Sequence, residues 1–241
     1  MTEQIEYRGF NINIHPDNDG QNPRTDWDCN LGTMICWRRN YNLGDKHDFN
    51  GPNEFIYDLA VEIGCNEDVA DEYYTEYPEA EFINKYLDKI DKKCIILPLY
   101  LYDHSGITIN THGFSCPWDS GQIGWIYVTY KKIRREYGWK LITKNRREKI
   151  VEYLRNEVKT YDQFLTGEVY GYIIEPTDKN KNIECDDACW GFFGYDHEKS
   201  GLFDHAKPSI DYAIKEYKEK VVKNKNRKVN INNFMKTCWA Y

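Results

Sequence analysis

A continuous apolar run, CIILPLYLY at residues 94–102, restricts the folds open to this chain. The run is short for a core helix and rich in apolar and aromatic side chains, so we expect a buried strand. Pro98 indicates an edge, a bulge or a strand start, because proline cannot donate a hydrogen bond to a neighbouring strand. Shorter strands are expected at 107–111 and 122–129. The middle of the chain therefore predicts a β-sheet.

Apolar residues at helical spacing predict helices around this sheet. The longest is expected from Thr143 to a capping Gly167, and another near 54–63 can take Asn53 as its N-cap. The remaining helices are expected at 82–90, 131–137 and 209–222. Further strands are expected at 10–14, 30–39, 169–175 and 188–193.

The order of these elements favours the α+β class, because strands and helices mix without strict alternation. We expect one domain over residues 1–222, built on a mixed, mostly antiparallel sheet with helices packed on one face. A basic tail at 223–241 follows, and Phe234 and Trp239 indicate that it docks rather than hangs free.

The 241 residues and the apolar content of 41% are those of an ordinary globular protein, whereas the aromatic content of 15% is unusual. No stretch of about 18 apolar residues is present, so we expect no membrane partner. The first residues lack the basic start and apolar run of a secretory signal, so the eight cysteines are expected to stay reduced.

The net charge of −7 is unevenly placed along the chain. Residues 54–91 carry 12 acids and two lysines, whereas residues 131–149 carry nine bases and two glutamates. Either these are two solvated faces that attract each other, or one of them steers a charged partner. A phosphate mimic on the acidic stretch is one form of the second hypothesis.

The densest set of reactive groups lies at residues 97–125, LPLYLYDHSGITINTHGFSCPWDSGQIGW. A cysteine nucleophile needs a base and an orienting carboxylate within reach, so Cys116, His104 and Asp119 are the catalytic candidates. A structural turn explains the same residues without chemistry. The residues expected to contact a ligand are Tyr102, Asp103, Ser105, Trp118, Ser120, Gln122, Tyr161 and Asp162. An aromatic pocket for a nucleotide or other small ligand, built from Tyr100, Tyr102, Trp118 and Trp125, is a further alternative.

Metal and cofactor sites have weaker support. The spacing of Cys185 and Cys189 is not that of a zinc knuckle, and the aspartates at 17–28 lack the glycine and closing glutamate of an EF-hand. Dinucleotide, P-loop and zincin motifs are missing. We therefore expect no cofactor and no metal. Direct nucleic-acid binding by the basic stretch is possible on its aromatic content but is not favoured at net −7.

The segments LPLYLYDHSGI, FSCPWDSGQ and YDQFLTGEVYG, with EYRGFNINI and NLGTMICWRR before them, resemble a family of uncharacterised proteins of phages, prophages and archaeal viruses. The resemblance covers about residues 5–195 and assigns no activity or catalytic residue. It implies a viral accessory protein in the host cytoplasm that binds a host protein or a nucleotide, in some cases to inhibit a host defence. A cysteine-dependent hydrolase or transferase using Cys116 and His104 remains the alternative.

Overall fold

The computed structural model describes residues 3–185 and 187–238, with side chains described as far as residue 228. Tertiary contacts divide the chain into two compact units. Unit 1 comprises Met1–Gly20 and Gly167–Tyr241, and unit 2 comprises Gln21–Thr166, so the second is inserted into the sequence of the first. The strand pairs described are all antiparallel, which confirms the α+β class with mostly antiparallel strands. One domain over residues 1–222 stays a prediction.

Unit 1 is a four-stranded sheet with one helix packed against it. The strands lie in the order β1 (Glu3–Tyr7), β2 (Phe10–Pro16), β7 (Val169–Pro176) and β8 (Ala188–Phe193). Alternate residues of β2, namely Phe10, Ile12 and Ile14, are buried in one cluster with Ile210 of helix α6 (Leu202–Cys238). The period of two therefore sends one face of the sheet toward the helix.

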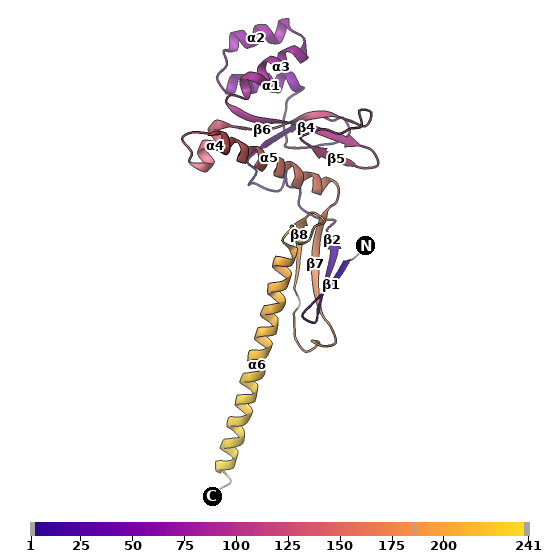
Figure 1. Cartoon of the computed structure of the whole chain (residues 1–241), viewed down its shortest axis with the longest axis vertical. Coiled ribbons are helices and arrows are strands. Elements are labelled where there is room, and N and C mark those ends of the chain that lie inside the picture. Colours follow the sequence, from indigo (N-terminus) through magenta and orange to yellow (C-terminus); the bar gives the residue numbers. More distant parts are fainter. Residues whose placement is uncertain (1–2, 186, 239–241) are drawn as a thin grey trace. The chain divides into compact units, whose positions relative to one another are not determined.

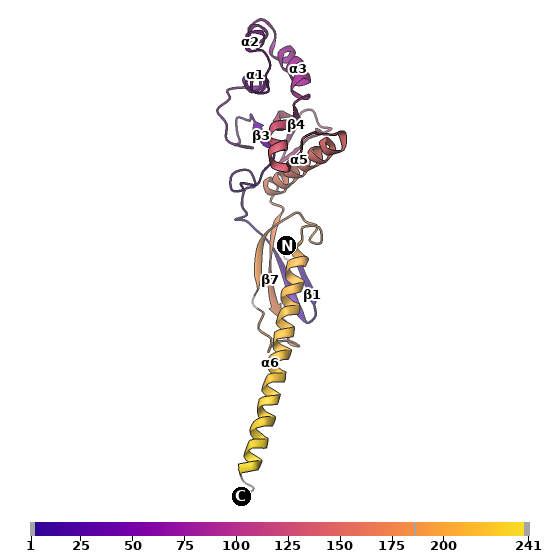
Figure 2. The same ribbon diagram turned by 90° about the vertical axis from the view of Figure 1, so that its left-hand side faces the viewer.

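Helix α6 is longer than the sequence predicted. It begins before Ser209, includes Pro208 and runs 37 residues, so the region expected as a separate tail continues the helix as far as Cys238. Its last turns continue beyond the end of the sheet, as Figure 2 shows. The prediction was too short because the apolar stripe weakens after Val222, while Lys and Arg residues in the following turns still favour a helix. The expected docking of the tail falls on the side chain of Phe234 and on Trp239, outside the described residues.

Unit 2 is a sheet covered by helices on both faces. Its strands lie in the order β3 (Thr33–Cys36), β6 (Ser120–Thr129), β4 (Cys94–Asp103) and β5 (Ile107–Asn110). On one face lie α1 (Pro52–Glu62), α2 (Glu67–Glu76) and α3 (Glu79–Ile90), and on the other α4 (Tyr130–Tyr137) and α5 (Lys144–Leu165) (Figure 1). The expectation of helices on one face is therefore wrong for this unit.

The two-sided burial of β4 explains this arrangement. Cys94 packs with α1 and α3, whereas Ile95 packs with α4 and α5. A strand buried on both faces reads as a continuous apolar run rather than as an alternation. Pro98 lies where β6 is the one described neighbour of β4, because β5 pairs only from Tyr100 onward. Of the edge, bulge or strand start that the proline indicated, the structure shows a locally unpaired edge of an inner strand, followed by a register shift between Leu99 and Tyr100.

Several local boundaries differ from the predictions. The strand expected at 30–39 is limited to β3, and α2 was not predicted. Helix α1 begins after Gly51 with a proline in its first turn, and no side chain caps it, so the Asn53 cap is wrong. Gly167 has φ +74, as expected for the residue that ends a helix. The prediction that this helix is the longest is wrong, because α5 has 22 residues and α6 has 37.

The acidic stretch lies almost entirely in solvent. Eleven of its 12 acids are exposed on α1, α2, α3 and the turns beside them, and Glu54 is half-buried. One ion pair, between Arg147 and Asp91, joins it to the basic stretch in the described part of the chain. Mutual attraction of the two stretches therefore rests on a single contact.

Candidate functional site

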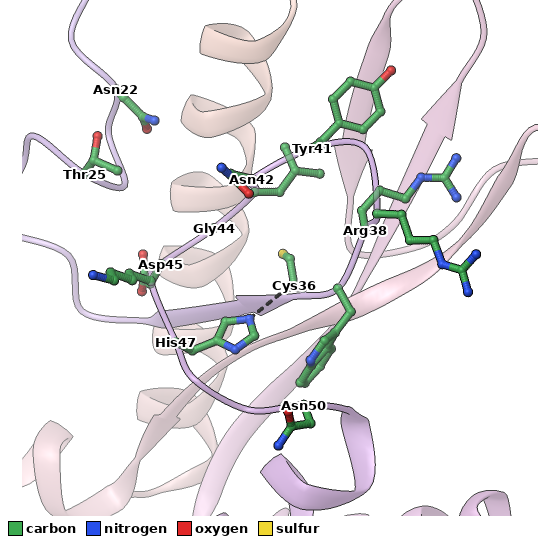
Figure 3. Close-up of a pocket in the computed structure, with 14 residues that line it drawn as sticks. Asn22, Thr25, Cys36, Arg38, Tyr41, Asn42, Gly44, Asp45, His47 and Asn50 are labelled. Atoms are coloured by element: carbon green, nitrogen blue, oxygen red, sulfur yellow. Dashed lines mark hydrogen bonds between the residues drawn. The ribbon is translucent and has the colours of Figure 1, made fainter.

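Residues 37–50 form a loop between β3 and α1 and line a cavity of unit 2. This loop cavity has a volume of about 750 Å³, within the range typical of ligand pockets. The chain curves round the hollow after Cys36, and Asn22 and Thr25 stand on a separate segment beside it (Figure 3). Its wall combines apolar surface from Trp37 and Leu43 with the side-chain amides of Asn22, Asn42 and Asn50.

A buried arginine holds this loop in place. Arg24, whose side chain is 1% exposed, donates from Nε and Nη2 to the two carboxylate oxygens of Asp45 at 2.7 and 2.6 Å. It also donates to Glu157 on α5 at 3.2 Å and to the carbonyl of Gly32 at 2.9 Å. The hydroxyl of Tyr161, also on α5, accepts from the backbone N–H of Gly44 at 3.1 Å. The loop is thus fixed to the rigid helix beneath it.

Three cations line the loop cavity, and its one carboxylate is already used. Arg38 pairs with Asp103 at 2.9 Å. Arg39 and Lys46 are exposed, and neither makes an ion pair within the described residues. The carboxylate of Asp45 is engaged by Arg24 and by the backbone N–H of Met34 at 2.9 Å. The cavity therefore carries an excess of positive charge.

His47 contributes an unpaired polar atom to the same wall. Its Nε2 lies 2.9 Å from the carbonyl oxygen of Cys36, and because a carbonyl only accepts, Nε2 carries the proton (Figure 3). The other ring nitrogen, Nδ1, is buried and has no partner. Such an atom costs free energy unless a donor reaches it. Burial raises the pKa of the neighbouring Cys36 thiol to about 12, so this thiol stays neutral.

A second, smaller cavity shares Trp37 and Arg38 with the first. This turn cavity, of about 260 Å³, lies where β4 ends and β6 begins. Tyr102 pairs with Ser120 across the two strands, and the backbone N–H of Asp103 donates to the carbonyl of Asp119 at 2.8 Å. Antiparallel pairing thus brings together two segments that are separated by the β5 hairpin.

Five of the residues predicted from the sequence line the turn cavity: Asp103, Trp118, Asp119, Ser120 and Gln122. Asp103 accepts from Arg38 and, at 3.2 Å, from the hydroxyl of Tyr41. The amide nitrogen of Gln122 donates to the carbonyl of Gly124 at 3.3 Å. Trp118 is 92% exposed, which is unusual for so large an apolar side chain.

The three catalytic candidates lie close together, but the carboxylate, not the imidazole, is next to the thiol. One carboxylate oxygen of Asp119, Oδ2, lies 3.6 Å from Cys116 Sγ and 3.5 Å from His104 Nδ1. The carboxylate therefore stands next to both, and no hydrogen bond joins the imidazole to the thiol in the described part of the chain. A nucleophile requires its base at hydrogen-bond distance. The side chain of His104 is also 63% exposed.

The other predicted binding residues lie elsewhere. Tyr102 packs against Phe114, with ring centres 5.6 Å apart, and Ser105 is exposed at the β4–β5 turn with φ +57. Tyr161 is buried, 1% exposed. Asp162 accepts from the Thr108 hydroxyl and the Ile109 N–H, both at 2.7 Å, and so ties β5 to α5. Of the proposed aromatic pocket, Trp125 is buried against Phe55 and Trp37, whereas Trp118 is exposed.

A third cavity, of about 370 Å³, lies beside the first turn of α4. Four cations line this lysine cavity, Lys92, Lys93, Lys131 and Arg134, with Glu62 as the one acid. Lys93 is held by the carbonyl of Ile63 at 2.6 Å. The lysine cavity is therefore the alternative anion-binding site to the loop cavity.

The loop cavity was not predicted from the sequence. Residues 37–50 have no apolar period, and Arg24 gives no local sign that it binds Asp45 and Glu157. The available signal was length, since structureless connections of about 12–15 residues in compact domains are uncommon and often functional. Neither alternative metal site is assembled, because the described residues contain no group of three or more His, Cys, Asp or Glu that can hold an ion.

No known protein family, curated protein or solved structure matches the chain. Among the described helices, none combines the length and the apolar character needed to cross a membrane.

Proposed function

We propose that this protein acts by binding rather than by catalysis, and that its ligand is a small anion of nucleotide size held in the loop cavity. The observation that carries the proposal is the pair Arg39 and Lys46, two cations that form no ion pair with any described residue and lie beside a carboxylate that Arg24 already neutralises. Phosphate groups are the common biological anions that such a pair fits.

The other features of the loop cavity support a ligand that is more than a bare phosphate. Its volume of about 750 Å³ accommodates a nucleotide. Three side-chain amides can accept or donate hydrogen bonds to a base or sugar.

Catalysis by Cys116 receives less support from the geometry. The thiol donates to Asp119 rather than to an imidazole, and the imidazole is mostly exposed. The family resemblance adds the setting of a viral accessory protein in a host cytoplasm. There the binding of a nucleotide signal would remove a host factor from use. Capture of a host protein on the acidic face of α1, α2 and α3 is the other form of this role.

Calorimetric titration with inorganic tripolyphosphate and with ATP tests the proposal. The wild-type protein is expected to bind both. The double variant Arg39→Gln/Lys46→Gln should weaken both affinities by about tenfold or more, because each neutralised phosphate contact is lost. Raising the salt concentration should weaken wild-type binding more than that of the variant.

A matched control removes the same charge from the lysine cavity. The double variant Lys131→Gln/Arg134→Gln should bind like the wild type, within about twofold. If this variant loses binding while Arg39→Gln/Lys46→Gln keeps it, the ligand belongs to the lysine cavity and the proposal is wrong. Failure of the wild type to bind either anion also contradicts it.

A further inference from the structure

We infer that the turn cavity is the base-recognition half of the same site and that it selects guanine. This inference rests on the proposed function, because it assumes that the phosphates lie in the loop cavity. The two cavities share Trp37 and Arg38 as a common wall. A single nucleotide can therefore place its phosphates on one side of Arg38 and its base on the other.

The common wall is fixed, so both halves keep their shape. The guanidinium of Arg38 is held by Asp103 at 2.9 Å. The indole N–H of Trp37 donates to the carbonyl of Phe49 at 3.0 Å, and its ring meets that of Trp125 edge to face. A rigid wall positions a ligand without the entropic cost of ordering loops.

Two polar atoms of the turn cavity are free to accept a hydrogen bond, and the guanidinium of Arg38 supplies donors beside them. Asp119 uses Oδ2 for Cys116 and His104, whereas Oδ1 has no hydrogen-bond partner among the described residues. Gln122 uses its amide nitrogen for Gly124, which leaves its oxygen to accept. The hydroxyl proton of Ser120 is donated to the carbonyl of Cys116. The two acceptors, Asp119 Oδ1 and the Gln122 oxygen, therefore favour a ligand edge with two N–H donors.

Trp118 adds a requirement for a flat partner. Its ring is 92% exposed beside the carboxylate of the next residue, Asp119. An exposed indole is the side chain on which a base stacks best, since every base presents a π-face. The cavity volume of about 260 Å³ accommodates one base and not a second nucleotide.

Guanine is the common base that meets both requirements. Its pairing edge carries two adjacent donors, N1–H and the 2-amino group, which match the two free acceptors, Asp119 Oδ1 and the Gln122 oxygen. Adenine and cytosine each present one amino group beside a ring nitrogen that is itself an acceptor, and this nitrogen repels a carboxylate. Uracil offers a single N–H between two carbonyls. Charge and hydrogen bonding therefore both favour guanine at Asp119.

Titration of the full chain with GTP, ITP and ATP tests the inference. We expect GTP to bind about tenfold or more tightly than ATP, the range of a matched pair of hydrogen bonds to a base edge. ITP keeps N1–H but lacks the 2-amino group, so its affinity should fall between the two. In Asp119→Asn the ratio of GTP to ATP affinity should fall close to one, because the amide presents a donor as well as an acceptor.

The matched control is Asp88→Asn, the same change at an exposed acid on α3 that lines none of the three cavities. It should keep the wild-type preference for GTP. Equal binding of GTP and ATP by the wild type, with loss in Arg39→Gln/Lys46→Gln, overturns the guanine assignment and leaves the anion site intact. A wild type that binds no nucleotide and no tripolyphosphate overturns both. An Asp119→Asn variant that folds and keeps the preference assigns the selection to another residue and overturns the inference.

Discussion

Replacement of Arg24 by methionine should destabilise unit 2 and open the loop cavity. The arginine side chain is 1% exposed and makes four hydrogen bonds to three groups. Its partners Asp45 and Glu157 are 23% and 9% exposed, so neither carboxylate can regain its full hydration when the arginine is removed. Breaking a buried ion pair from one side typically costs about 3–5 kcal/mol. Because Asp45 retains some contact with water, we expect a loss of about 3 kcal/mol in the free energy of unfolding.

The pH dependence of this loss gives an independent check. Burial raises the pKa of Glu157, while Arg24 and the backbone N–H groups of Leu31 and Gly32 lower it. Without the arginine the pKa rises further. A carboxyl group with a raised folded-state pKa stabilises the fold at low pH, and that contribution is lost as the pH rises through the folded pKa. The penalty in Arg24→Met should therefore shrink as the pH falls from about 8 to about 5.

Urea unfolding of wild type and variant at each pH measures both effects. The control is Arg39→Met, which removes an exposed cation of the same loop and should change the unfolding free energy by less than about 0.5 kcal/mol. A loss below about 1 kcal/mol in Arg24→Met, or a penalty that grows toward acid pH, would refute the assignment of Arg24 as the anchor of the loop.

Three further predictions concern thiols, alkaline pH and a glycine. Native iodoacetamide labelling followed by mass spectrometry should modify Cys116 faster than buried Cys36, yet no faster than in urea-unfolded protein; a higher native rate would favour the enzyme. Burial raises the pKa of Cys36 and of Tyr127 to about 12, so unfolding free energy should fall as the pH rises from about 9 to about 12, and a flat urea-midpoint profile would contradict this. In Gly124→Ala the new Cβ would lie 1.9 Å from the carbonyl oxygen of Ile35 in β3, so the free energy of unfolding should fall by about 3 kcal/mol or more. In the control Gly121→Ala the new Cβ meets no atom within 4 Å, so the free energy of unfolding from urea titration should change by less than about 1 kcal/mol.

The elements that the sequence predicted well are those with a strong apolar pattern. The run at 94–102 became β4, and the stripe from Ile150 to Leu165 became the buried face of α5. Helix α2 was not predicted because Ala70 is its one buried residue, and β1 was not predicted because its side chains are exposed or only half-buried. Local pattern reports burial, so elements with little burial leave little trace.

The pairing of β2 with β7 lies beyond local pattern altogether. More than 150 residues of sequence separate Ile12 from its partner Ile174. A single sequence contains no signal for which distant strands pair, and it therefore gave no reason to expect two sheets or an inserted unit. The register follows from burial of one face only when the partner strand is known.

Only part of the candidate site could be predicted, because the sequence shows local clusters of side chains but not contacts between distant segments. Asp103 and the 118–122 segment were recognised because reactive side chains cluster at the ends of strongly predicted strands. Tyr161 and Asp162 were expected to bind a ligand, yet their polar atoms hold Gly44 and β5 in place. The loop at 37–50 depends on Arg24 and Glu157, which are far apart in sequence, so its cavity emerges only in three dimensions.

Hydrogen exchange with and without GTP tests the central claim most directly, because it locates the ligand. Mass spectrometry of peptides should show slower exchange at residues 36–50 and 118–123, the walls of the loop and turn cavities. Peptides from α1, α2 and α3 should be unchanged. Slower exchange confined to residues 129–134, beside the lysine cavity, or no change anywhere at saturating GTP, would contradict the account.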